Sequence, residues 1–265
     1  NKTVQLCSTI DKENIEICSD TLCYYVFPLL NKTLNKTNFD TNNRMTLIDV
    51  LPQLIKYTNA SNKSLKKNVF SIISILLIED DIDCKINLLE KLPNLVMFLG
   101  KTVTNDLILS HLITYLNESS LRLRIALINC LCKISPFLGQ ISFQEFIYPL
   151  LIQNLYLLPD QKDLIFTVLR NLHELIIDDS NFIVNKKVIK FKTLIEDHLV
   201  HFLLLPNQVL KKAAIQLLKD IIIDKSDLSE LYCLYYPLIK PYYHMNMEIN
   251  AQLLEINCRQ SITEE

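Results

Sequence analysis

Apolar residues recur three and four positions apart along most of the chain, and strict alternation of apolar and polar residues is rare. This spacing is typical of amphipathic α-helices rather than β-strands. The pattern is clearest at 142–158, 160–177 and 207–222. The residues predicted to face inward there are Phe143, Phe146, Ile147, Leu150 and Leu151; Leu164, Ile165, Val168, Leu169, Leu172 and Ile176; and Leu210, Ala213, Ala214, Leu217, Leu218 and Ile221.

Polar residues precede the predicted first helices of successive helix pairs, where their side chains can accept the free backbone N–H groups. They are Asn42, Asp83, Ser120, Asp160 and Asn207, with Asn246 as a candidate sixth. The intervals are near 40 residues except for the step of 47 before Asn207, where the polar segment 178–192 predicts a longer loop. Second helices are predicted at 21–34, 62–78, 104–117, 142–158, 188–205 and 228–242, with Ser142 and Glu145 as a capping box.

Both glycines of the chain follow the same dipeptide, at Phe98-Leu99-Gly100 and Phe137-Leu138-Gly139, 39 positions apart. Glycine accepts the left-handed conformation that ends many helices, so we expect two helices to end in the same way. The spacing is typical of HEAT or armadillo repeats. Two isolated glycines are also too few for a phosphate-binding glycine loop or a nucleophile elbow, both of which need several glycines close together.

The sequence therefore predicts an all-α, HEAT/armadillo-like helical-repeat solenoid of about five to six antiparallel helix pairs. We expect a lead-in or partial repeat at 1–20, a single solenoid over 21–260 and a tail at 261–265. Repeat units bury their apolar faces against neighbours, and neither end of the chain is strongly polar. We therefore expect this chain to be a piece of a longer protein.

The composition argues against several classes of function. The chain is 49% hydrophobic and 21% charged, as folded proteins are, and its net charge of −2 provides no basic field for nucleic acid. No apolar stretch approaches the roughly 20 residues that a membrane span needs. The eight cysteines are scattered along predicted helices, which favours reduced thiols over a disulfide framework.

Few residues are candidates for a catalytic, metal-binding or membrane-binding site. His198 and His201 lie three apart beside Glu196 and Asp197, which fits either an incomplete metal site or ordinary helix packing. Ser110 and His111 are adjacent on a predicted helix and point about 100° apart, which argues against a nucleophile and base pair. Lys186 and Lys187, on the predicted long loop, fit either contact with an anionic membrane surface or a solvated loop. No cofactor site is predicted, and the chain reads as an interaction scaffold.

The segment 99–131 carries a more specific pattern: Asn105-Asp106, then Leu109-Ser110-His111, then Ile113-Thr114, Leu116 and Asn117. It resembles the helical-repeat region of the regulatory-subunit-4 family of class III phosphoinositide 3-kinases, the vacuolar-protein-sorting pseudokinase-like subunits. Segments 27–30, 194–222 and 236–242 are similar to the same region with less specificity.

The resemblance implies a non-catalytic arm between a protein-kinase-like domain and a WD40 propeller, neither of which is in this sequence. It also implies partners, a lipid-kinase catalytic subunit and a beclin-like subunit. The implied place is the cytoplasm, peripheral on endosomal or autophagic membranes, and the implied roles are vacuolar protein sorting and autophagy.

No catalytic residue of the family transfers to this chain. Asn105, Asp106, Ser110 and His111 are either partner contacts or structural residues, with Thr104 or Asn105 capping a helix and His111 packing on a neighbouring unit. Two other functions stay open: a HEAT-repeat scaffold of the phosphatase or nuclear-transport type, and a metal-dependent enzyme using His198 and His201.

Overall fold

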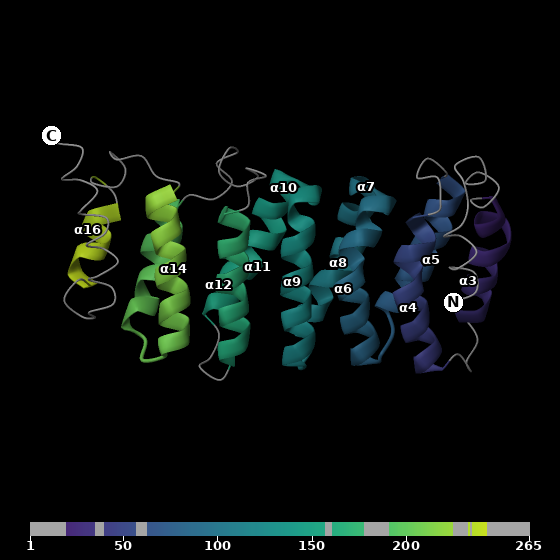
Figure 1. Cartoon of the computed structure of the whole chain (residues 1–265), viewed down its shortest axis with the longest axis horizontal. Coiled ribbons are helices and arrows are strands. Elements are labelled where there is room, and N and C mark those ends of the chain that lie inside the picture. The colour runs from purple at the N-terminus through teal and green to yellow at the C-terminus, as the bar shows by residue number, and fades with distance from the viewer. Residues whose placement is uncertain are drawn as a thin grey trace. The chain divides into compact units, whose positions relative to one another are not determined.

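The structure, a computed structural model, describes residues 20–34, 40–56, 63–156, 161–177, 191–224, 233 and 235–242. These residues form helices and contain no strand, which confirms the predicted all-α fold class. They fall into two compact units, divided between Leu138 and Gly139, and each unit is built of helices packed side by side (Figure 1). The predicted lead-in at 1–20, apart from Asp20, and the predicted tail lie outside the described residues, and a single solenoid over 21–260 stays a prediction.

In the first unit, α6 packs against α4, α5 and α9, and α3 packs against α5. Equivalent first helices of successive pairs, α4, α6 and α9, thus lie in one row, as in a helical-repeat solenoid. The described helices are η2 (Leu22–Val26), α3 (Phe27–Leu34), α4 (Thr41–Lys56), α5 (Lys63–Leu77), α6 (Ile82–Leu99), α7 (Lys101–Val103), η3 (Thr104–Ile108), α8 (Leu109–Thr114), η4 (Tyr115–Asn117) and α9 (Leu121–Leu138).

In the second unit, α12 packs against α11 and α14, and η8 packs against α14. Its described helices are α10 (Gln140–Ser142), η5 (Phe143–Ile147), α11 (Tyr148–Leu155), α12 (Lys162–Ile177), α13 (Phe191–Thr193), η7 (Leu194–Leu199), η8 (Val200–Leu204), α14 (Gln208–Asp224), α16 (Tyr236–Ile239) and η10 (Lys240–Tyr242). The predicted stripe on α12 is buried throughout, from Leu164 to Ile176. On α14 the predicted stripe is buried except for Ala213, which is half-buried.

Gly100 and Gly139 both stand directly after a first helix, as predicted. Each has a positive φ, 97° and 95°, but ψ is 160° and 176° rather than the value near +47° of the left-handed helical region. The prediction that both glycines adopt the left-handed helical conformation is therefore wrong, because their φ is positive as expected but their ψ is extended. At Gly100 the physical reason is that one residue joins two helices: its N–H donates to Val96 O, and its own carbonyl accepts from Thr104 N in the next helical segment.

Two predicted helix starts are confirmed. Ser120 Oγ accepts from Leu123 N at 3.4 Å, and Asn207 Oδ1 accepts from the backbone N–H groups of Val209 at 3.0 Å and Leu210 at 3.3 Å. Asp160 and Asn246 lie outside the described residues.

Two other predicted starts are displaced. Helix α6 begins at Ile82, and its cap is Asp81, whose carboxylate accepts from Cys84 N at 2.8 Å; Asp83 lies inside the first turn. Helix α4 begins at Thr41, one residue before Asn42. Capping depends on which polar side chain reaches back to the first turn, and in both places several neighbouring residues have the required chemistry.

The second helices contain short π-helical segments that the sequence pattern did not predict. Tyr148 N donates to Phe143 O and Leu109 N donates to Thr104 O, five residues back in each case. Pro149 is the second residue of α11, two positions after the end of η5, and since it has no N–H it cannot donate to the carbonyl four residues before it. The wider turn keeps Phe143, Ile147 and Leu151 buried and leaves Phe146 exposed, so the prediction of Phe146 in the core is wrong.

The predicted capping box of Ser142 and Glu145 is also wrong. The helical segment begins earlier, at Gln140, and the Ser142 side chain makes no capping hydrogen bond. The predicted helix at 104–117 likewise begins earlier, at Lys101.

A buried polar network ties α6 to its neighbours in the first unit. Lys85, only 7% exposed on α6, donates to Glu118 Oε1 at 2.8 Å, and its Nζ lies 5.0 Å from the centre of the Tyr115 ring. The Tyr115 hydroxyl donates to Leu77 O at the end of α5. Burial, helped by the charge of Glu118, raises the pKa of Tyr115, so this hydroxyl stays a donor. The network holds α6 in place, and α6 forms one wall of a surface groove.

Candidate functional site

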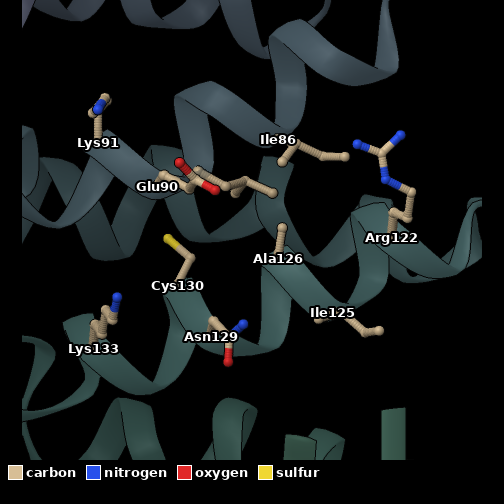
Figure 2. A pocket seen from close by; sticks show the side chains of 10 residues that line it. Ile86, Glu90, Lys91, Arg122, Ile125, Ala126, Asn129, Cys130 and Lys133 are labelled. Atoms are coloured by element: carbon tan, nitrogen blue, oxygen red, sulfur yellow. The ribbon is translucent and has the colours of Figure 1, made fainter. Parts of the chain in front are cut away.

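A groove of about 550 Å³ lies between α6 and α9 in the first unit. Helix α6 lines it with Ile86, Glu90 and Lys91, and Figure 2 shows Ala126 and Cys130 of α9 pointing toward them. The remaining lining residues are Leu89, Arg122, Ile125, Asn129 and Lys133. The groove is open along the surface, so it has the form of a docking site more than of an enclosed reaction chamber.

Helical spacing explains why α9 presents these residues. Arg122, Ala126, Asn129 and Lys133 follow one another at steps of four, three and four, which places them on one face of the helix. The opposite face carries the buried leucines, including Leu123, Leu127 and Leu131. The small side chain of Ala126 leaves room over the centre of the stripe.

The groove is bordered by cations. Arg122 lies 3.4 Å from Asp83 and Lys91 lies 3.7 Å from Asp49, and the first of these pairs is 77% and 67% exposed. Such exposed pairs contribute about 0–1 kcal/mol each, so both cations remain available to an incoming carboxylate. Cys130 is buried at the base, where desolvation raises the pKa of its thiol to about 12 and keeps it protonated.

This groove was not predicted from the sequence. Along either helix alone, its lining residues form no recognisable motif. They line a groove only because α6 and α9 lie side by side. The available signal was the Arg122 to Lys133 stripe itself, in which polar and small residues follow a helical period on a strongly apolar segment.

In the second unit, Tyr156 brings together the two histidines that the sequence singled out. Its hydroxyl donates to Asp197 O at 2.8 Å and contacts His198 Nδ1, while its ring stacks on His201 with centroids 5.6 Å apart and planes at 19°. A hydroxyl has one proton, so the Tyr156 hydroxyl that donates to Asp197 O accepts from His198, whose Nδ1 then carries the hydrogen of the second bond. Tyr156 was not predicted as a site residue, because it lies outside the apolar stripe of the predicted helix at 142–158; in the structure α11 ends at Leu155, just before it.

The electrostatics of this cluster favour neutral rings. Burial lowers the pKa of both histidines; at His201 the neighbouring His198 lowers it further, while at His198 the charge of Asp197 acts in the opposite direction. A cavity of about 640 Å³ adjoins the cluster, bordered by His201, Phe202, Lys162 and Leu210. The geometry gives these histidines an aromatic packing role.

The hypothesis of a metal site at His198 and His201 finds no support in the part of the chain that the structure describes. There, no three His, Cys, Asp or Glu side chains gather as a bound metal ion requires. One ring nitrogen of His198 is engaged by Tyr156.

The structure places the four candidate contact residues of the specific sequence block on η3 and α8. Asp106 and Ser110 are exposed and four apart, so they share a face, while Asn105 and His111 are half-buried. Ser110 Oγ donates to Leu107 O at 2.7 Å. A partner-contact role for Asn105, Asp106, Ser110 and His111 stays a prediction.

The alternative that Thr104 or Asn105 caps a helix is wrong, because the helical segment already begins at Lys101. Thr104 is fully buried, and its hydroxyl donates to Gly100 O at 2.9 Å. The lysines at Lys186 and Lys187 lie outside the described residues, so their role also stays a prediction. Among the described helices none is both long and apolar enough to pass through a membrane.

Comparison with known proteins places this architecture in context. The sequence model of a family described as "PIK3R4-like, middle domain" matches residues 29–264. A Komagataella pastoris protein named "Putative serine/threonine-protein kinase VPS15" is 33% identical over 231 residues, which cover 83% of this chain and 16% of that protein. A Candida glabrata protein named "non-specific serine/threonine protein kinase" is 32% identical over 194 residues, covering 72% of this chain and 13% of that protein. The chain thus spans less than a fifth of the length of these relatives.

Proposed function

Because the chain belongs to the PIK3R4-like middle domain family, we propose that it is a non-catalytic scaffold segment of the regulatory subunit of a class III phosphatidylinositol 3-kinase complex. The observation that carries the proposal is the family match over 29–264, on a chain whose described residues form helical repeats. Repeats of this kind present long surfaces and grooves to partners.

The kinase names of the relatives are consistent with a non-catalytic segment. This chain corresponds to 13% and 16% of their lengths and matches a middle domain, so we assign any protein-kinase activity to other parts of such proteins. The sequence has only two glycines, too few for the glycine-rich loop that covers the phosphates in protein kinases.

The proposed partners are the lipid-kinase catalytic subunit and a beclin-like subunit. The proposed location is cytoplasmic, peripheral on endosomal or autophagic membranes, with roles in vacuolar protein sorting and autophagy. A phosphatase or nuclear-transport scaffold would share the fold, but the family match favours the lipid-kinase complex.

Size-exclusion chromatography of the purified 265-residue chain, mixed with the purified catalytic and beclin-like subunits, tests the proposal. We expect co-elution with at least one of them, and no phosphorylation of lipid or protein by the chain alone. The Leu217→Asp variant, altered at a fully buried position, should lose co-elution together with its fold, and Lys192→Glu, altered at an exposed position, should retain both. A well-folded chain that co-elutes with neither subunit would contradict the scaffold role.

A further inference from the structure

The groove between α6 and α9 has the length and form of a docking site for one helix. Its lining stripe on α9 runs from Arg122 to Lys133, eleven positions, or about 16 Å at 1.5 Å per residue. That length equals about three helical turns. Two adjacent helices present ridges and a groove to a third helix, whereas an added strand needs an open sheet edge, which the described residues do not contain.

The middle of the groove is apolar. Ile86, Ile125 and Ala126 line it and are half-buried, so part of each side chain still faces solvent. Figure 2 shows Ile86 on α6 and Ala126 on α9 on opposite sides of the groove. Aliphatic side chains of a partner would remove this apolar surface from water, which favours binding.

The charge of the lining is opposite in sign to that of the chain. Among the lining residues, Lys91, Arg122 and Lys133 provide three positive charges and Glu90 one negative charge, whereas the whole chain carries −2. Asp49 and Asp83 lie outside the lining and offset part of the charge of Lys91 and Arg122, and the exposed Arg122–Asp83 pair is weak enough for a partner carboxylate to compete with Asp83. Arg122 and Lys133 stand at the two ends of the α9 stripe. This arrangement is complementary to carboxylates at the two ends of an apolar segment.

We propose that the groove docks an acidic amphipathic helix of a partner protein. The helix carries carboxylates about eleven residues apart, one for Arg122 and one for Lys133, and aliphatic residues between them that cover Ile86 and Ala126. An anionic bilayer is the less suitable occupant. A bilayer surface is nearly flat on this scale, whereas the apolar part of the groove is recessed between the charged side chains. The inference rests on the proposed scaffold role, but its test measures peptide binding rather than complex assembly, so either can fail alone.

Selection of 16-residue peptides from a random library displayed on phage, with the 265-residue chain as the target, tests the proposal. We expect the enriched peptides to carry acidic residues about eleven positions apart, with aliphatic residues three and four apart between them. Fluorescence anisotropy of one labelled synthetic peptide then measures affinity. Ala126→Phe, which fills the groove, should weaken binding at least tenfold.

Charge reversal provides a second, independent measurement. Arg122→Glu with Lys133→Glu should weaken binding of the acidic peptide at least tenfold, and a peptide with lysines in place of its two acidic residues should prefer this variant. Lys101→Glu, at an exposed lysine of α7 outside the groove, is the matched control and should bind as the unaltered chain does. Melting temperatures establish that each variant is folded.

Three results would overturn the proposal. One is the absence of enriched peptides, or enrichment of basic ones. Another is full binding to the folded Ala126→Phe chain. The third is binding of vesicles of phosphatidylcholine and phosphatidylserine in equal amounts that depends on Lys133 and displaces the peptide.

Discussion

Replacing Gly100 by alanine isolates the backbone strain at the junction of two helices. Gly100 has φ 97° and ψ 160°, a conformation that almost only glycine adopts. The nearest atom that an added Cβ would meet is Lys66 Nζ at 4.0 Å, an ordinary contact distance. The substitution therefore strains the backbone without a steric clash.

The expected loss follows from two opposing effects. A non-glycine residue held in such a region costs about 1–3 kcal/mol. Alanine also restricts the unfolded chain, which returns about 0.4–1 kcal/mol of stability. The middles of the two ranges, about 2 and about 0.7 kcal/mol, leave a net destabilisation of about 1.3 kcal/mol. For a chain of this size that lowers the melting temperature by roughly 3–5 °C.

Urea denaturation followed by circular dichroism measures the effect. Gly100→Asn is the informative comparison, because asparagine tolerates the left-handed helical region but not a ψ of 160°, so it should destabilise as alanine does. Lys101→Ala, at the exposed neighbouring position, should change stability little. An alanine variant as stable as the unaltered chain, or an asparagine variant that recovers the loss, would refute the reasoning.

Three further predictions concern the core and the titrating groups. Glu118→Gln removes the carboxylate partner of the buried Lys85 and should cost about 1–3 kcal/mol in urea unfolding, most of which Lys85→Met in the same chain should restore; equal stability of the three forms would show that the pair is unimportant. Leu169→Asp places a charge at a position only 1% exposed and should cost several kcal/mol, so a variant with an unchanged melting temperature would contradict the observed core. Because the pKa of His201 is lower in the folded chain than its ordinary 6.5, the unfolded chain binds more protons as the pH falls below about 7. The free energy of unfolding should therefore decline toward the folded pKa, and His201→Gln should decline less over the same range; parallel pH profiles would exclude this contribution.

The sequence predicted the fold because the relevant signals are local. Helical periodicity placed the buried stripes of α12 and most of those of α14, and the repeated Phe-Leu-Gly segment located the ends of α6 and α9. The prolines carry a further repeat signal, since Pro52, Pro93 and Pro136 lie inside α4, α6 and α9 at intervals of 41 and 43 residues.

Local signals failed where several residues had the same chemistry or where the helix changed its period. Asp81 and Asp83 are equally good caps in sequence, and only the path of the backbone selects Asp81. Phe146 fits a regular helical stripe, but the π-helical turn of η5 rotates it toward solvent.

The candidate sites were the least predictable part. The groove requires α6 and α9 to lie side by side, so the stripe from Arg122 to Lys133 on α9 could not identify it alone. The Tyr156 cluster joins the end of α11 to η7 and η8 across about 40 residues of sequence. Only the folded chain shows that His198 and His201 both contact the Tyr156 side chain.

Deletion of residues 21–242 from the full-length protein, followed by co-purification of the lipid-kinase catalytic and beclin-like subunits, tests the scaffold role most directly. We expect that these subunits no longer co-purify in normal amounts. We also expect the intact protein with Lys186→Glu and Lys187→Glu, on the loop predicted from the sequence, to stay folded. Undiminished co-purification of both subunits with the deleted protein would contradict the proposed scaffold function.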